Sequence, residues 1–271
     1  MLIKYFILNY TALHIFKLID YYNRYAHLQE ENKGFRRFFY SFDCLYTTNI
    51  IKSFLKDPSP PPRGLILKNL TSGLLYAGFG IALLLLNRHF AWWKVSPLID
   101  YLSLGLEYYF LAMGAAVLVI NLHRLAGYKV PEFFLNPLRS SSPGEFWTRW
   151  NIPVHEWLRN NVFIKARGHH HFWRAVFLTF MVSGIFHEYT ISLASNTLNG
   201  FMTAYFLVQF LAFLVGVSLH RLLSIPFLRH HSLVTSKAFL GIRWALTMVS
   251  VFLPSVLFLY NLRKVFPIHG V

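Results

Sequence analysis

Residues 173–195 read WRAVFLTFMVSGIFHEYTISLAS, an apolar run that carries a histidine and a glutamate in its second half. About 20 predominantly apolar residues are enough for a helix to cross a lipid bilayer. In such a helix His187 lies about 21 Å along the axis from the start of the run, because each residue advances it by about 1.5 Å. Ionisable side chains are costly at that depth and mark functional sites, so His187 and Glu188 are candidates for one.

Other apolar runs of similar length occur along the chain. Those that meet the same length requirement are residues 65–87, 98–120, 173–195, 202–223 and 239–261. A further run, residues 2–19, is interrupted by Lys4, His14 and Lys17, so it either spans the membrane or lies in the interface as an amphipathic helix. We therefore expect an all-α fold, a polytopic bundle of about six spans with amphipathic interfacial helices, forming a single membrane domain over residues 1–271.

The composition agrees with a membrane protein. Of the 271 residues, 55% are hydrophobic, 18% aromatic and 14% charged, whereas soluble domains carry about 25% charged residues. The net charge of +15 arises in the connections between apolar runs and not on one polar face. We therefore expect membrane lipids and no nucleic acid as partners. The only cysteine, Cys44, rules out an intramolecular disulfide framework, and the first run lacks a cleavage site and is expected to stay as an anchor.

Lysine and arginine concentrate on every second connection between the runs. The rich segments are residues 20–64, 121–172 and 224–238, and the poor ones are residues 88–97, 196–201 and the tail after 262. Since basic residues favour the cytoplasmic side of a membrane protein, the two long rich segments are expected in the cytoplasm.

An aromatic and basic loop precedes the His-Glu run and reads SPGEFWTRWNIPVHEW over residues 142–157. Ser142 and Glu145 have the spacing of a capping box, with a proline at the first helical position, so a helix is expected to begin there. Pro153 is expected to bend or restart that helix. Asn151 stands just before the restart, where it could cap the second helix or contact a substrate.

The tryptophans and arginines of this loop admit two interpretations. Trp147, Trp150 and Trp157 could anchor the loop at the membrane–water boundary, where tryptophan is enriched, or line a substrate site. Arg149 and the basic residues after it could bind anionic headgroups or the phosphates of a coenzyme A.

The polar residues around His187 form two stripes, because residues three and four apart share a helix face. Ser183 and His187 lie on one stripe, and Gly184 and Glu188 lie on the next. A histidine hydrogen-bonded only to hold helices together is the structural alternative. The spacing of the histidines predicts no metal site. The expected chemistry is general-base catalysis, in which neutral His187 takes the proton of a hydroxyl that attacks an acyl carbon, while Asn151 hydrogen-bonds the acyl carbonyl or orients a substrate.

At these residues the chain resembles the membrane-bound O-acyltransferase family, and within it the wax-synthase and diacylglycerol or sterol acyltransferase branch. FWTRWN over residues 146–151 looks like the family's FW-x-x-WN motif, and Phe186-His187-Glu188 looks like its histidine-bearing helix, 36 residues beyond Asn151. The strong resemblance covers residues 131–195, the expected catalytic core. It implies that His187 is the catalytic base and Asn151 its partner. The substrate-binding candidates are Trp147, Arg149, Trp150, Trp157, Ser183 and Glu188.

The resemblance also implies the substrates. The donor would be acyl-coenzyme A arriving from the cytoplasm, with no further cofactor, and the acceptor would be a lipid or other apolar alcohol arriving through the membrane. Such an enzyme of lipid metabolism would lie in the endoplasmic reticulum of a eukaryote or in the inner membrane of a bacterium, and a homo-oligomer stays open. Family members usually have more spans, so interfacial helices such as Phe35–Phe54 are expected within residues 20–64.

Two other functions are kept as alternatives. One is acetyl transfer to a polysaccharide or small metabolite, which a short acyl channel would favour. The other is a non-enzymatic transporter or scaffold, since buried histidine and glutamate can relay protons. The paired internal repeats typical of transporters are not found in the sequence.

Overall fold

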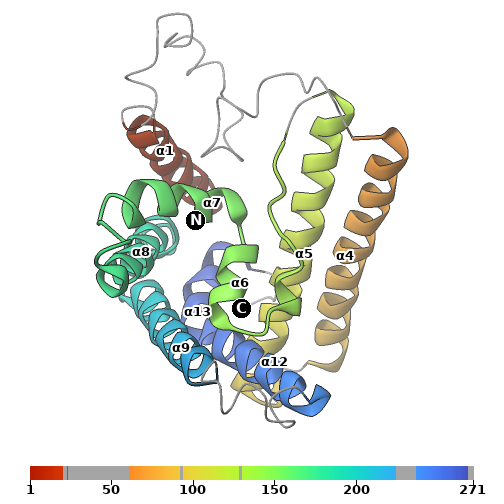
Figure 1. Cartoon of the computed structure of the whole chain (residues 1–271). Coiled ribbons are helices and arrows are strands. Elements are labelled where there is room, and N and C mark those ends of the chain that lie inside the picture. Colours follow the sequence, from red (N-terminus) through yellow and green to blue (C-terminus); the bar gives the residue numbers. More distant parts are fainter. Residues whose placement is uncertain (21–22, 24–60, 92–93, 128–129, 224–235, 268–271) are drawn as a thin grey trace, which may run out of the picture.

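The computed structural model describes residues 1–20, 23, 61–91, 94–127, 130–223 and 236–267, and within these ranges all regular elements are helical (Figure 1). The long helices are α1 (Leu2–Asp20), α4 (Arg63–Phe90), α5 (Pro97–Leu125), α8 (Phe172–His187), α9 (Phe201–Leu223), α12 (Lys237–Phe252) and α13 (Ser255–Val265). The short ones are η4 (Pro137–Arg139), α6 (Pro143–Arg149), α7 (Ile152–Leu158), η5 (Arg159–Phe163) and η6 (Glu188–Ser192). The predicted all-α fold is confirmed.

Among the described residues, five helices are long and apolar enough to cross a membrane. They are α1, α4, α5, α9 and the helix formed by α8 together with η6. The bent pair of α12 and α13 can form a sixth span, with an angle of 44° between its two helices. The apolar run expected to span over residues 239–261 therefore consists of two helices. The break falls at Leu253 and Pro254, because proline lacks an N–H and clashes with the preceding turn. The proposed interfacial helix Phe35–Phe54 lies outside the described residues.

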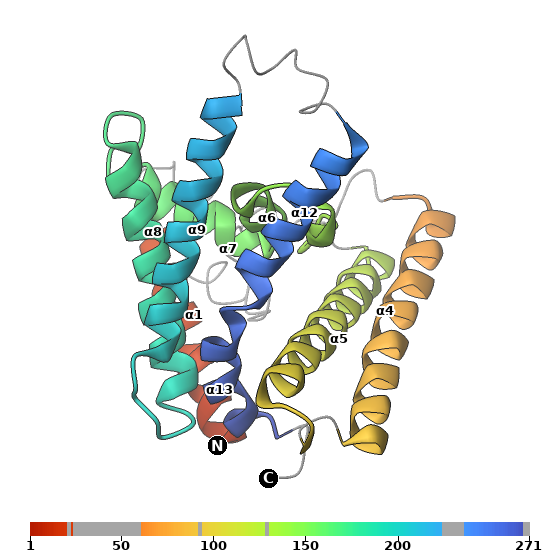
Figure 2. The same cartoon turned by 90° about the horizontal axis from the view of Figure 1, so that it is seen from below.

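The long helices alternate in direction through the bundle (Figure 2). The N-terminus, the end of α13 and the connection between η6 and α9 lie at one end of the molecule, where α4 also ends and α5 begins. The start of α8, the end of α9 and the start of α12 lie at the other end. This alternation gathers the ends of the basic segments on one side, as the orientation argument requires.

Helices α4 and α5 run side by side and approach each other through glycines (Figures 1 and 2). A Cβ added at Gly114 of α5 would lie 2.6 Å from the backbone nitrogen of Ala77 on α4. No side chain fits at that distance without separating the helices, so Gly114 sets the spacing of this pair.

Replacing Gly114 with alanine should therefore destabilise the protein by about 1–3 kcal/mol, the usual penalty of overpacking. Gly78→Ala is the matched control, because nothing lies within 4 Å of a Cβ added at Gly78. Thermal unfolding in detergent micelles measures both. Equal melting temperatures for the two variants would contradict the close contact.

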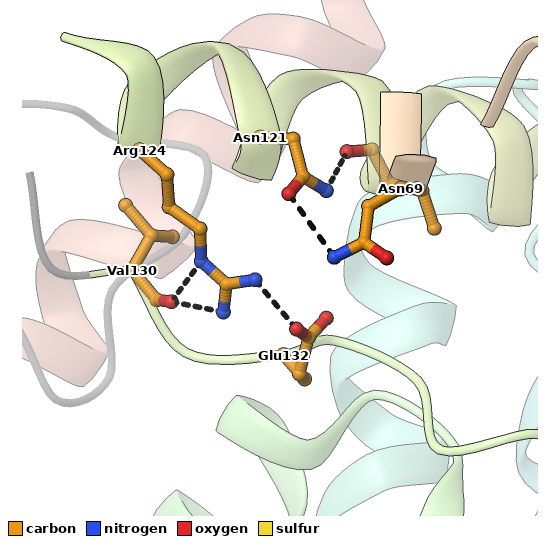
Figure 3. A network of polar contacts seen from close by, with 6 residues as sticks. Asn69, Asn121, Arg124, Val130 and Glu132 are labelled. Carbon is orange, nitrogen blue, oxygen red and sulfur yellow. Dashed lines mark hydrogen bonds and ion pairs between the residues drawn. The ribbon is translucent and has the colours of Figure 1, made fainter. Parts of the chain in front are cut away.

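A polar network fixes the chain where it leaves α5 (Figure 3). Arg124 donates from Nη2 to the Val130 carbonyl at 2.7 Å and pairs through Nη1 with Glu132 Oε1 at 2.6 Å. One turn earlier, Asn121 accepts a hydrogen bond from Asn69 of α4 at 3.5 Å. The guanidinium thus holds the segment that leads from α5 towards α6.

Candidate active site

A cavity of about 580 Å³ lies inside the bundle, bordered by α5, α6, α7, η5, α8, α9, α12 and α13. Its volume falls within the roughly 300–1,000 Å³ of small-molecule sites. Phenylalanine, tyrosine, tryptophan and aliphatic side chains form most of its wall. The polar residues that line the cavity include Asn151, His155, Ser183, His187 and Tyr205. The structure therefore brings the two predicted catalytic residues to one apolar chamber.

His187 is the last residue of α8, and its ring borders the cavity. Its Nδ1 lies 2.7 Å from the carbonyl oxygen of Ser183. A carbonyl only accepts, so Nδ1 carries the proton and the lone pair of the neutral ring is on Nε2. The ring stacks on Phe206 at 4.9 Å and meets Phe258 edge-on at 5.2 Å between centroids. These contacts fix the ring and leave Nε2 without a protein partner among the described residues.

Asn151 occupies the position before α7 in a left-handed conformation, with φ 45° and ψ 62°. Two backbone hydrogen bonds hold this turn, from Leu135 to the Arg149 carbonyl at 3.0 Å and from Ile152 to the Phe133 carbonyl at 2.9 Å. The side chain makes no capping hydrogen bond, so the structural alternative of an N-cap is wrong.

The Asn151 amide has no hydrogen-bond partner within the described ranges. Its Oδ1 is buried and unpaired, a state that costs roughly 1–3 kcal/mol. Nδ2 makes no hydrogen bond either, and the residue borders the cavity. An amide kept unpaired beside an apolar chamber is suited to a ligand, because its N–H groups can donate to a carbonyl oxygen.

The predicted helix start and restart are confirmed. The Ser142 hydroxyl accepts from the Glu145 backbone N–H at 3.2 Å, and Glu145 Oε2 accepts from the Ser141 N–H at 2.7 Å. Helix α6 therefore begins at a proline, and α7 begins around Pro153 after the Asn151 turn. The local sequence thus presents Asn151 at a bend between two short helices.

Trp147, Trp150 and Ser183 also lie in the cavity wall. Trp147 donates from Nε1 to Gln209 Oε1 at 3.3 Å, and Trp150 stacks on Tyr109 at 5.6 Å. Because the Trp147 N–H is bonded inside the protein, this tryptophan is not an anchor at the water boundary.

Arg149, Trp157 and Glu188 do not belong to the cavity wall formed by the described residues. Arg149 pairs with Glu145 at 2.5 Å, and Trp157 donates to the Phe16 carbonyl of α1 at 3.1 Å. Substrate binding by these three residues stays a prediction, since each already has a structural contact.

Glu188 has its structural contact at the start of α9. Its two carboxylate oxygens accept from the backbone N–H groups of Gly200 at 3.0 Å and Thr203 at 3.1 Å. A carboxylate at a helix N-terminus satisfies free N–H groups there. Glu188 therefore holds α9, the helix that carries Phe206 against the His187 ring.

Sequence reasoning missed Tyr205 and Gln209. Gln209 is fully buried and donates to the Ser250 carbonyl at 3.1 Å, so it ties Trp147 of α6 to α12. The two residues are four apart in the apolar run 202–223. A glutamine within a predicted span was the signal that could have drawn attention to this face.

His155 is a second imidazole in the wall, one helical turn after Asn151. Burial lowers the pKa of His155, whereas Glu156 raises it and Arg159 lowers it further. Since the unfolded chain then binds the proton at higher pH than the folded one, His155 should cost stability as the pH falls below about 6.5.

His155→Gln should therefore flatten the loss of stability between pH 7.5 and 5.5, which melting temperatures in micelles measure. His170→Gln, at an exposed position, is the control and should keep the slope of the original protein. Parallel slopes for both variants would contradict the prediction.

Comparison with known proteins gives a family match and several partial relatives. The family model of the membrane-bound O-acyltransferases matches residues 68–249, more than half of the chain. The probable alginate O-acetylase of Pseudomonas putida is 33% identical over 85 residues, covering 30% of this chain and 18% of the relative. Diacylglycerol O-acyltransferase 1 of Bos taurus is 38% identical over 64 residues, covering 23% and 13%. The Arabidopsis thaliana enzyme of the same name is 32% identical over 62 residues, covering 22% and 12%. The chain thus matches less than a fifth of the length of these relatives.

Proposed function

The chain belongs to the membrane-bound O-acyltransferase family and is an integral membrane protein, and from this premise we propose that it transfers an acyl group from acyl-coenzyme A to the hydroxyl of a lipid or other apolar alcohol. One observation carries the proposal. His187, whose Nε2 has no partner among the described residues, and Asn151, whose amide is unpaired there, border the same large aromatic cavity. A base and a donor to a carbonyl are the two groups that acyl transfer needs.

In the proposed reaction, His187 Nε2 takes the proton of the acceptor hydroxyl. The alcohol oxygen forms a bond to the thioester carbon, and the carbonyl electron pair moves to its oxygen. The Asn151 amide donates a hydrogen bond to that negative oxygen. Collapse of the intermediate breaks the carbon–sulfur bond, and the leaving thiolate takes the proton from the imidazolium. The Ser183 carbonyl stabilises the imidazolium through its bond to Nδ1. The products are the ester and coenzyme A.

The size and apolar wall of the cavity support a long acyl chain or an apolar acceptor over a polar one. A small acetyl group would leave most of the 580 Å³ unfilled. Similarity to alginate O-acetylases favours acetyl transfer to a polysaccharide or small metabolite as the second candidate. Proton transport is less well supported, because both Glu188 oxygens are engaged by backbone N–H groups.

Mass spectrometry of lipids from cells with and without the protein tests the proposal. We expect esters of apolar alcohols only with the protein, such as wax esters, acylglycerols or sterol esters. The purified protein in micelles should then use long-chain acyl-coenzyme A faster than acetyl-coenzyme A. Acetylated polysaccharide without new lipid esters would favour the second candidate, and proton flux into liposomes without any acyl product would favour a transporter.

Arg124 should affect this activity although it lies outside the cavity wall, because it holds the segment that pairs with the Asn151 turn. Arg124 binds Val130 and Glu132, and the following residues, Phe133 and Leu135, bond to either side of Asn151. Arg124→Met should lower kcat by about 10- to 100-fold, since an error near 1 Å in a catalytic group can cost that much.

Arg124→Lys should recover only part of that loss, because lysine lacks the planar fork that binds a carbonyl and a carboxylate together. Arg88→Met, at the opposite end of the bundle and exposed, is the control and should leave kcat unchanged. An Arg124→Met protein as active as the control would show that the clamp does not serve the site.

A further inference from the structure

Tyr205 of α9 is a buried tyrosine that borders the cavity. Its hydroxyl makes no hydrogen bond to the described residues. The hydroxyl oxygen is also not among the unbonded polar atoms that are completely shielded from solvent. The oxygen therefore has accessible surface. Because the rest of the side chain is buried and the residue lines the chamber, this surface faces the cavity.

Several other hydroxyls in the cavity wall are bonded to backbone carbonyls, whereas that of Ser183, like that of Tyr205, makes no hydrogen bond within the described residues. Tyr108 donates to the Phe266 carbonyl at 2.8 Å, and Thr179 donates to the Ala175 carbonyl at 2.8 Å. Buried tyrosine hydroxyls usually have a partner, because leaving one unpaired is costly. The hydroxyl of Tyr205 is thus available to a molecule in the chamber.

Tyr205 is connected to the surroundings of both proposed catalytic groups through aromatic neighbours. Its ring lies 5.3 Å from Phe258, which is also 5.2 Å from the His187 ring. Its ring is 6.5 Å from that of Trp147 on α6, four residues before Asn151. The Tyr205 hydroxyl therefore opens into the same chamber that would hold a thioester carbonyl between His187 and Asn151.

We propose that the Tyr205 hydroxyl is the second hydrogen-bond donor to the oxygen that becomes negative during acyl transfer. This inference rests on the proposed function and adds a catalytic residue to it. Sites that stabilise such an oxygen commonly use two donors, because the charge forms on one atom with two or more acceptor directions. Asn151 would supply one donor from the α6–α7 bend, and Tyr205 would supply the other from α9.

Tyr205→Phe tests this directly, since it removes the hydroxyl and keeps the ring contacts with Trp147 and Phe258. We expect kcat to fall by about 10²-fold while KM changes by less than about threefold, as for the loss of one oxyanion donor. Binding of a thioether analogue of acyl-coenzyme A, which has no carbonyl, should be unchanged. Tyr76→Phe on α4, outside the cavity wall, is the matched control and should retain full activity.

The double variant Tyr205→Phe/Asn151→Gly should lose less than the product of the two single losses, because both donors serve one oxygen. A Tyr205→Phe protein with kcat within twofold of the original, or with weakened thioether binding, would overturn the inference. If His187→Ala is inactive in the same assay, the proposed function survives that result. If the unaltered protein forms no ester at all, the proposed function fails, and the role of Tyr205 fails with it.

Discussion

Replacing His187 with alanine should reduce ester formation by the purified protein by about 10³-fold, because general-base catalysis contributes roughly 10²–10⁴. Asparagine is the sharper replacement. Its amide can reproduce the bond from Nδ1 to the Ser183 carbonyl, but it has no group at the position of Nε2. His187→Asn should therefore keep the fold and lose the activity.

The control for this pair is His170→Asn at an exposed position in the loop before α8. It should retain the rate of the unaltered protein. Full acyl transfer by either His187 variant in purified micelles would overturn the general-base assignment. A large drop in melting temperature with His187→Asn would instead point to a structural role for the ring.

Asn151 should separate activity from stability. Asn151→Gly preserves the left-handed turn, which glycine adopts freely, and removes only the amide. We expect a 10²–10³-fold lower kcat, the usual effect of losing an oxyanion donor. The melting temperature should hardly change, because the side chain makes no capping bond and a lost cap would cost about 1 kcal/mol.

Asn151→Asp is the companion variant. It has nearly the same shape, but an ionised carboxylate only accepts hydrogen bonds and would repel the negative oxygen. It should therefore be at least as slow as Asn151→Gly. Normal rates with Asn151→Asp would show that donation from this position is not needed, and an equal loss of stability and activity with Asn151→Gly would return the residue to a structural role.

The parts of the fold that follow from local sequence could be predicted. Apolar run length gave the spans, because the bilayer sets a minimum helix length. The Ser142–Glu145 capping box gave the start of α6 through backbone groups only a few residues apart. The 44° bend in the last span was also local, and Pro254 was the signal that was passed over.

Contacts between distant segments could not be predicted from periodicity. The contact of Glu188, a substrate-binding candidate, with the start of α9 was not foreseen. Nor was the hydrogen bond from the Trp157 N–H to the Phe16 carbonyl of α1 foreseen. Each of these partners is determined by how the helices pack. The periodicity of polar residues shows which face of a helix is polar, but not which segment contacts that face. The convergence of His187 and Asn151 was expected from their chemistry and from the family resemblance, and not from helix periodicity.

The most direct test of the central claim is a cryo-electron-microscopy structure of the protein with a long-chain acyl-coenzyme A analogue in which a methylene replaces the thioester sulfur. We predict that its carbonyl oxygen lies within about 3.2 Å of the Asn151 amide nitrogen, and its carbonyl carbon lies within roughly 5–6 Å of His187 Nε2, leaving room for an alcohol oxygen about 3–3.5 Å from that carbon. An acyl chain lying outside the cavity, or a His187 ring turned towards lipid with the analogue bound, would contradict the claim.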